Sequence, residues 1–201
     1  MDDTVPFGGR AYWGLLGLLA FARGMDMFST WVASPNLVLE GNPLAKKLGW
    51  RGNIALSLAV SLVFALWPLP AVIISTTSVL VAARNFQSAW LMRSLGEQIY
   101  RAWHVERVQE TNISLYLFCL FGQTLLTAVV GGAVIVATNG HNQDQPVALA
   151  IGLGIIAYAL AVAFYTLLGI VRLRRADKRE ESRKLVTEPL ARLDQANDVL
   201  P

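Results

Sequence analysis

Charged residues are scarce in this sequence, and three long stretches contain none. They make up 15% of the 201 residues, against about 25% in a typical soluble domain. No Asp, Glu, Lys or Arg occurs in residues 53–83, 112–137 or 145–171. Charge-free apolar runs of about 18 or more residues are typical of membrane-spanning helices. The sequence therefore predicts an all-α membrane protein, a polytopic bundle of transmembrane helices.

Cysteine and metal-ligating patterns are equally scarce. Cys119 is the only cysteine, so an intramolecular disulfide is excluded and no cysteine spacing typical of a metal site occurs. His104 and Glu106 are two positions apart, which places them about 200° apart around a helix axis, so they cannot chelate one ion on a regular helix. We expect neither a metal nor another cofactor.

Motifs of common enzymes and of nucleic-acid-binding modules are missing too. The chain has no Gly-x-Ser-x-Gly nucleophile motif, no paired acidic motif for a metal–phosphate site, and no nucleic-acid-reading module. No catalytic residue is assigned. The opening residues, MDDTVPFGGR, are acidic before the first arginine, whereas a secretory signal begins basic. We therefore expect the first apolar segment to be retained as a span.

Five membrane spans are predicted from the apolar runs. They are residues 11–33, 53–67, 71–86, 112–138 and 146–171. The sequence Trp-Pro-Leu-Pro at 67–70 separates the second span from the third, because proline lacks an amide donor and favours a turn. In the last two spans, small residues mark places where helices can approach closely. These are Ala128, Gly131, Gly132, Gly152 and Gly154.

Two polar segments accompany the spans. Residues 87–110 are predicted to form an amphipathic helix on the cytoplasmic membrane surface, because Leu95, Ile99 and Trp103 recur every four residues. This segment either continues the third span or follows it, and Gly96 is the expected bend. Residues 172–201 are predicted to form a charged cytoplasmic tail, whose first basic cluster, Arg-Leu-Arg-Arg, is suited to anionic lipid headgroups.

The basic residues predict the orientation. The sequence has 17 lysines and arginines. All of them except Arg10 and Arg23 lie in residues 38–52, in residues 84–111 or beyond residue 171. Five spans place these three regions on one side of the membrane. The positive-inside rule then predicts an N-terminus outside and a C-terminus in the cytoplasm. Tyr12, Trp13 and Trp67 would consequently lie at the outer interface.

A cluster of charged and polar residues is predicted near the inner leaflet. Arg23, Asp26 and Thr30 are spaced i, i+3, i+7 and share one helix face. Asp26 lies about 22 Å along the first span and Arg84 about 20 Å along the third, at 1.5 Å per residue, so their depths are similar. Asn85 is at the same level. Ionisable groups at such depth usually face a bundle interior, and this cluster is either a structural ion pair or a ligand site.

The loop after the first span contains a helix start. Asn42 followed by Pro43 is the pattern of an N-cap and a first helical position, and Gly49 would stop the short helix that follows. Glu40 has no such structural explanation. Its carboxylate either folds back onto Arg23 or Arg84 or is solvated.

The motifs Asp-Met-Phe-Ser-Thr at 26–30 and Glu-Gly-Asn-Pro at 40–43, followed by an apolar span, resemble a family of small prokaryotic membrane proteins of unknown function. The resemblance covers about residues 15–86. It implies a prokaryotic cytoplasmic membrane location and a site at Asp26, Thr30, Glu40 and Asn42. It implies no particular chemistry.

Three roles are compatible with these features. In the first, the chain is a non-catalytic accessory or scaffold subunit of a membrane complex, and the charged cluster holds helices together. In the second, it binds or carries a lipid, an ion or a small molecule, although no inverted repeat typical of transporters is visible. In the third, it is an intramembrane enzyme that uses Asp26 and Glu40 as an acid–base or metal–carboxylate pair. The expected partners are the bilayer, anionic lipid headgroups and other membrane subunits, and no nucleic acid.

Overall fold

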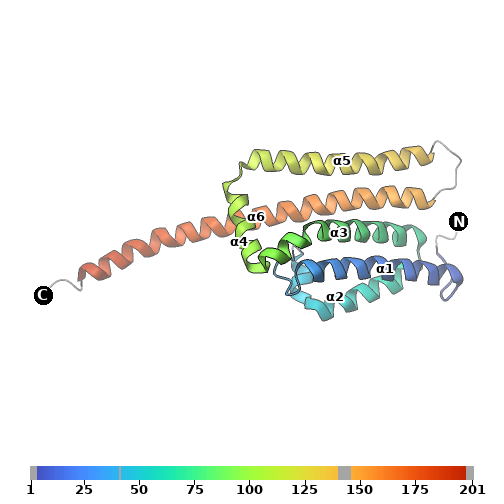
Figure 1. Ribbon diagram of the computed structural model, residues 1–201, viewed down its shortest axis with the longest axis horizontal. Helices are drawn as coiled ribbons and strands as arrows, with labels where there is room; N and C mark the ends of the chain where they lie inside the picture. Colours follow the sequence, from blue (N-terminus) through green and yellow to red (C-terminus); the bar gives the residue numbers. More distant parts are fainter. Residues whose placement is uncertain (1–3, 41, 140–145, 198–201) are drawn as a thin grey trace. The chain divides into compact units, whose positions relative to one another are not determined.

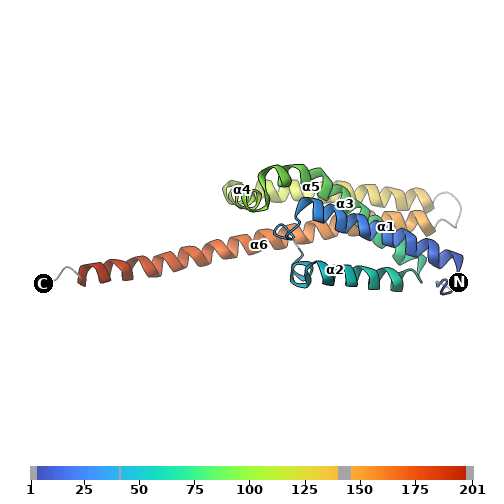
Figure 2. The same ribbon diagram turned by 60° about the horizontal axis from the view of Figure 1, so that its bottom comes forward.

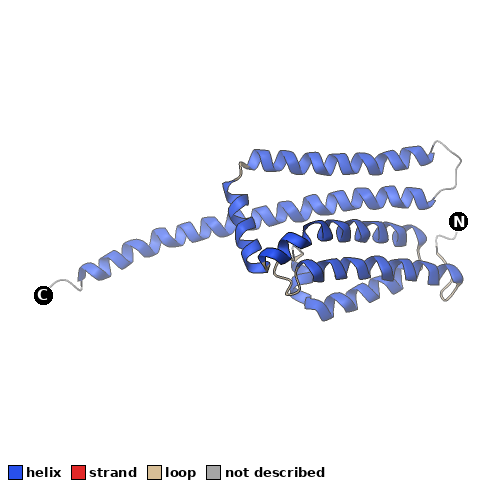
Figure 3. Ribbon diagram, viewed as in Figure 1, coloured by secondary structure: helices blue, strands red, loops and turns tan. Residues whose placement is uncertain are grey.

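The computed structural model describes residues 4–40, 42–139 and 146–197, and this part of the chain is all-α (Figures 1 and 3). Its helices are α1 (Arg10–Ala33), α2 (Pro43–Phe64), α3 (Pro68–Leu95), α4 (Glu97–Glu110), α5 (Ile113–Asn139) and α6 (Pro146–Asn197). The described residues contain no strand. The chain divides into two compact units, Met1–Tyr165 and Thr166–Pro201, and the candidate site lies in the first.

Three of the helical segments are long and apolar enough to cross a membrane. They are Pro68–Leu95, Ile113–Thr138 and Pro146–Arg175. At 1.5 Å per residue even the shortest of them exceeds the hydrocarbon thickness of about 30 Å. α1 is 24 residues long, but Arg23 and Asp26 interrupt its apolar sequence. The N-terminal part of α2 carries Lys46, Lys47 and Arg51.

α1 and α3 lie side by side in both views (Figures 1 and 2) and pack against each other. The buried residues of each helix form one stripe, and most of them are small. They are Tyr12, Leu19, Ala22, Ser29 and Ala33 on α1, and Ala71, Ser75, Ser78, Ala82 and Ala89 on α3. Small side chains at spacings of three, four and seven residues let two helix backbones approach closely, as they do between membrane helices.

Tyr12 is buried near the N-terminal end of α1, where α1 packs against its neighbouring helices. It belongs to a buried cluster with Leu19, Ala65 and Ala71. Only 1% of Tyr12 is exposed, and its hydroxyl donates to the carbonyl oxygen of Leu62 at 3.3 Å. The position expected for Tyr12 at the outer membrane interface stays a prediction. A buried tyrosine needs a partner for its hydroxyl, and the C-terminal end of α2 supplies one.

The boundaries of the second and third helices differ from the predicted spans 53–67 and 71–86. α2 ends at Phe64, and α3 begins at Pro68 and continues to Leu95. The helix break predicted at Trp-Pro-Leu-Pro is present, between Phe64 and Pro68. Pro68 is itself the first residue of α3, because a proline in the first turn lacks only an N–H that would have no helical partner. α3 therefore includes the first part of the segment predicted as a surface helix at 87–110. The bend at Gly96 has φ +80°, as expected.

The local predictions for the start of α2 are confirmed. Asn42 is the N-cap, and its side chain accepts a hydrogen bond from the Leu44 amide at 3.0 Å. Gly49 interrupts the helix with φ 63° and ψ −173°, a conformation that favours glycine. α2 thus consists of a short helix up to Gly49 and a longer one after it.

Glycines also mark close backbone approaches between α5 and α6. A Cβ at Gly131 would lie 2.7 Å from the Gly152 carbonyl oxygen, which is shorter than van der Waals contact. Gly154 marks an approach of α6 to α3 instead, because its Cβ would lie 2.7 Å from Cβ of Thr76 on α3. The predicted close contacts are therefore present at these glycines, but Gly132 has open space where a Cβ would be.

Candidate functional site

The centre of the candidate site is Arg23, whose guanidinium contacts three helices. Its Nη1 donates to Oδ2 of Asp26 on the same helix at 3.0 Å. Its Nε donates to Oγ of Ser57 on α2 at 3.1 Å, and Nη1 also donates to Oγ of Ser78 on α3 at 3.4 Å. The planar fork of an arginine presents several donors in fixed directions. One side chain therefore holds α1, α2 and α3 together.

The Arg23–Asp26 ion pair is largely enclosed by these helices. Its side chains are 27% and 20% exposed. A second ion pair with the same i, i+3 spacing, Arg107–Glu110 on α4, has side chains that are each 55% exposed. The pair in α1 is therefore the one in which hydrogen bonds and helix packing replace water.

Glu40 lies in the loop between α1 and α2. Among the described residues it has no ion pair with Arg23 or Arg84. Its Oε1 accepts a hydrogen bond from the Asn42 amide at 2.8 Å, immediately before the α2 N-cap. Glu40 and Asn42 therefore organise the start of α2, and this is a structural explanation for the Glu-x-Asn-Pro motif.

Asn85 forms a second polar contact between α1 and α3. Its Nδ2 donates to Oγ of Ser29 and to Oγ1 of Thr30, both at 3.2 Å. Ser29 in turn donates to the backbone carbonyl of Asp26 at 2.8 Å. The predicted residues Thr30 and Asn85 are thus brought together, next to the Arg23–Asp26 pair along the same interface.

Arg84 is not bonded to the Arg23–Asp26 pair. It lies seven residues after Thr77, and two helical turns place these two residues on one face. Thr77 donates to the Gly154 carbonyl oxygen of α6 at 3.1 Å, whereas Ser78 and Asn85 face α1. The Nη1 atom of Arg84 is buried and has no hydrogen-bond partner in the part of the chain that the structure describes.

The loop between α1 and α2 is fixed by hydrogen bonds at both ends. Ser34 Oγ accepts from the Leu39 amide at 3.1 Å, and Trp50 Nε1 donates to the Pro35 carbonyl at 2.8 Å. The Asn36 amide donates to Oε1 of Glu97 at 3.0 Å, which connects the loop to the first residue of α4. Leu37 is buried with φ +54°, a strained conformation for this residue type that the surrounding contacts maintain.

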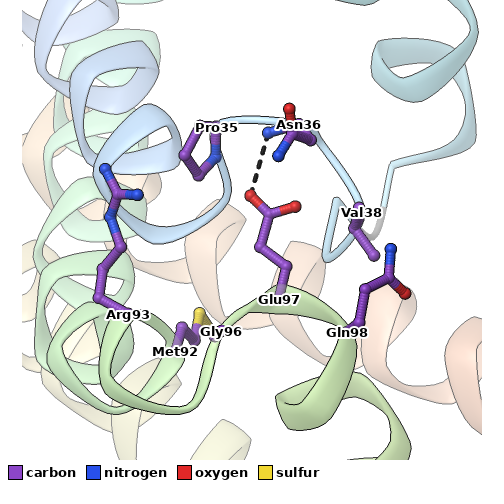
Figure 4. Close-up of a pocket in the computed structure, with 8 residues that line it drawn as sticks. All are labelled: Pro35, Asn36, Val38, Met92, Arg93, Gly96, Glu97 and Gln98. Carbon is purple, nitrogen blue, oxygen red and sulfur yellow. Dashed lines mark hydrogen bonds between the residues drawn. The ribbon is translucent and has the colours of Figure 1, made fainter.

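These loop contacts border a pocket of about 380 Å³ (Figure 4). The pocket lies between the loop, the end of α3 and the start of α4. It is lined by Pro35, Asn36, Val38, Met92, Arg93, Gly96, Glu97 and Gln98. Its volume is in the range of sites for small molecules.

Sequence reasoning missed the serines that complete the site. Ser57 and Ser78 are 5% and 4% exposed and accept hydrogen bonds from Arg23. The signal that marks Ser78 is the small-residue stripe of α3, whereas Ser57 lies in an apolar helix without such a periodic marker. The residues of the pocket were missed because they come from a loop and from two helices on either side of a bend.

The described residues hold no group of three or more His, Cys, Asp or Glu side chains that could bind a metal ion. No family model, curated protein or solved structure matches this chain. The resemblance to a family of small prokaryotic membrane proteins therefore stays a prediction. The geometry of the candidate site is therefore the basis for its interpretation. The Arg23 guanidinium donates its hydrogen bonds to residues of α1, α2 and α3.

Proposed function

We propose that this chain is a five-span protein of a prokaryotic cytoplasmic membrane, with its N-terminus outside and its C-terminus inside. α3, α5 and the first part of α6 provide three of the spans, and α1 and α2 provide the other two. The distribution of lysine and arginine supports this orientation.

The surface of α1 and α2 supports their inclusion as spans. Large apolar side chains point outward, and Phe21 and Leu58 are 63% and 57% exposed. The residues buried against the neighbouring helices include Ser29, Ser57 and Ser61. Helices that are surrounded by lipid typically have apolar side chains on the outer face and small or hydroxylated side chains where they pack together.

For its role, we propose a non-catalytic accessory or scaffold subunit of a membrane complex. The observation that carries this proposal is the direction of the Arg23 hydrogen bonds, which end on Asp26, Ser57 and Ser78 of the same three-helix unit. A ligand site would direct such donors into a cavity. Here they hold the unit in one arrangement, which is suited to presenting a fixed surface to other subunits.

The experiment is purification of the chain from native membranes in mild detergent, followed by mass spectrometry of everything retained. We expect partner subunits in a fixed ratio to the wild-type chain. We expect Asp26→Asn to lose them, because it removes the anion that holds Arg23 in place.

The matched control is Glu110→Gln, which makes the same change of charge in an exposed pair of the same spacing. It should retain the partners in the wild-type ratio. A wild-type chain that purifies alone, or partners retained equally by wild type and Asp26→Asn, would contradict the proposed role.

A further inference from the structure

The pocket beside the α3–α4 bend contains a carboxylate that is only half satisfied. Oε1 of Glu97 accepts from the Asn36 amide at 3.0 Å. The other oxygen, Oε2, is buried and has no hydrogen-bond partner in the part of the chain that the structure describes. Figure 4 shows the side chain of Glu97 standing in the pocket, between the loop and the bend. A buried carboxylate oxygen without a partner is costly, and a bound cationic donor would remove that cost.

Arg93 places a positive charge on the wall of the same pocket. Its guanidinium lies over the ring of Trp31, 5.8 Å from the centroid, which holds the cation by one face and leaves its N–H edges for hydrogen bonds. The ion pairs of the described residues are Arg23–Asp26 and Arg107–Glu110. Arg93 and Glu97 therefore line one pocket without neutralising each other.

Gly96 explains why the two charges remain apart. On a continuous helix, residues 93 and 97 would be neighbours at i, i+4 and would pair. The positive φ of Gly96, +80°, ends α3 and starts α4 in another direction. In Figure 4 the Arg93 guanidinium lies to one side of Pro35, while Glu97 points from the start of α4 toward Asn36.

We propose that this pocket binds a zwitterionic group that carries a primary ammonium and a phosphate, the chemistry of phosphoethanolamine. The ammonium donates to Oε2 of Glu97, and the phosphate accepts from the guanidinium of Arg93. Gln98 and Asn36 supply further polar groups on the wall. An ammonium suits Glu97 better than a quaternary amine does, because the unsatisfied oxygen needs an N–H donor. An arginine fork suits a phosphate.

This group occurs both as the headgroup of phosphatidylethanolamine and as a free small molecule. The test uses the full chain purified in detergent and native mass spectrometry of bound lipid. Phosphatidylethanolamine and phosphatidylcholine with identical acyl chains are titrated separately. We expect phosphatidylethanolamine to bind about tenfold more tightly or better, since a hydrogen bond to a charged group is worth at least one factor of ten. Equal binding of the two lipids by the wild-type chain would overturn the proposal without any substitution.

Two variants test the assigned carboxylate. Glu97→Gln keeps an acceptor for the Asn36 amide but removes the charge, and it should lose the preference for phosphatidylethanolamine. Glu106→Gln makes the same change at an exposed position of α4 and should keep it. An undiminished preference in Glu97→Gln would show that the lipid binds elsewhere and would overturn the assignment.

Soluble O-phosphoethanolamine distinguishes the two sources. If it displaces the lipid, the pocket recognises the free zwitterion. If it does not displace the lipid while the preference for phosphatidylethanolamine holds, the ligand is the membrane lipid. This test is separate from the proposed role as a subunit, because Glu97 and Arg93 lie outside the Arg23 cluster.

Discussion

Replacing Arg23 with methionine removes the hydrogen bonds that tie α1 to α2 and α3, and it leaves the Asp26 carboxylate without its cation. Methionine keeps an unbranched apolar stem of similar length, so the main change is the loss of the guanidinium. The expected result is a large loss of stability of the three-helix unit.

The magnitude follows from burial. Removing one partner of a buried ion pair costs about 3–5 kcal/mol. Since the Arg23 and Asp26 side chains are 27% and 20% exposed, we expect the lower end of that range, about 3 kcal/mol. Arg107→Met breaks a pair whose side chains are each 55% exposed, and it should cost at most about 1 kcal/mol.

A double variant separates the effect of an unpaired charge from the value of the pair itself. Arg23→Met with Asp26→Leu removes both polar groups, and replacing both partners by apolar groups is often nearly neutral. We expect it to recover most of the stability lost in Arg23→Met. The assay is reversible unfolding in mixed micelles, followed by tryptophan fluorescence. Equal losses in Arg23→Met and Arg107→Met, or no recovery in the double variant, would refute this reasoning.

The remaining predictions concern local contacts. Asn42→Ala should destabilise the start of α2 by about 1 kcal/mol, because the Leu44 amide loses its acceptor; hydrogen exchange of that amide measures it, and Asn42→Ser, which retains a cap, should exchange as slowly as wild type. Gly131→Ala should lower thermal stability, because its Cβ would lie 2.7 Å from the Gly152 carbonyl oxygen. Gly132→Ala, at a position with open space, should raise stability by up to about 1 kcal/mol through helix propensity, and the opposite order of the two variants would contradict the helix contact.

Local sequence signals predicted the helices well because they depend on neighbouring residues. Asn42, Pro43 and Gly49 define the start of α2 through capping and φ preference, which need no tertiary information. The charge-free runs indicated the apolar helices for the same reason. The boundary at Pro68 was placed differently because a proline both ends one helix and starts the next, and sequence alone does not decide between these roles.

The site was predictable only where its residues share a helix face. Arg23, Asp26 and Thr30 were grouped by their spacing on α1. Arg84 was added by depth alone, and depth does not specify which side of α3 a residue faces. The actual partners of α1 on that helix are Ser78 and Asn85.

The pocket could not have been predicted at all. It depends on how the loop after α1 meets the α3–α4 bend, and the hydrogen bond from the Asn36 amide to Glu97 spans 61 residues of sequence. Such long-range contacts leave no periodic pattern. Only the bend at Gly96 was visible in advance.

Thiol labelling tests the proposed membrane topology directly. Cys119 is the only cysteine, so a Cys119→Ser chain can carry single new cysteines in intact cells. A membrane-impermeant maleimide should label Arg10→Cys from outside, and it should label Lys47→Cys and Arg107→Cys only after the membrane is permeabilised. Labelling of Lys47→Cys in intact cells, or protection of Arg10→Cys, would contradict the five-span arrangement with its basic regions inside.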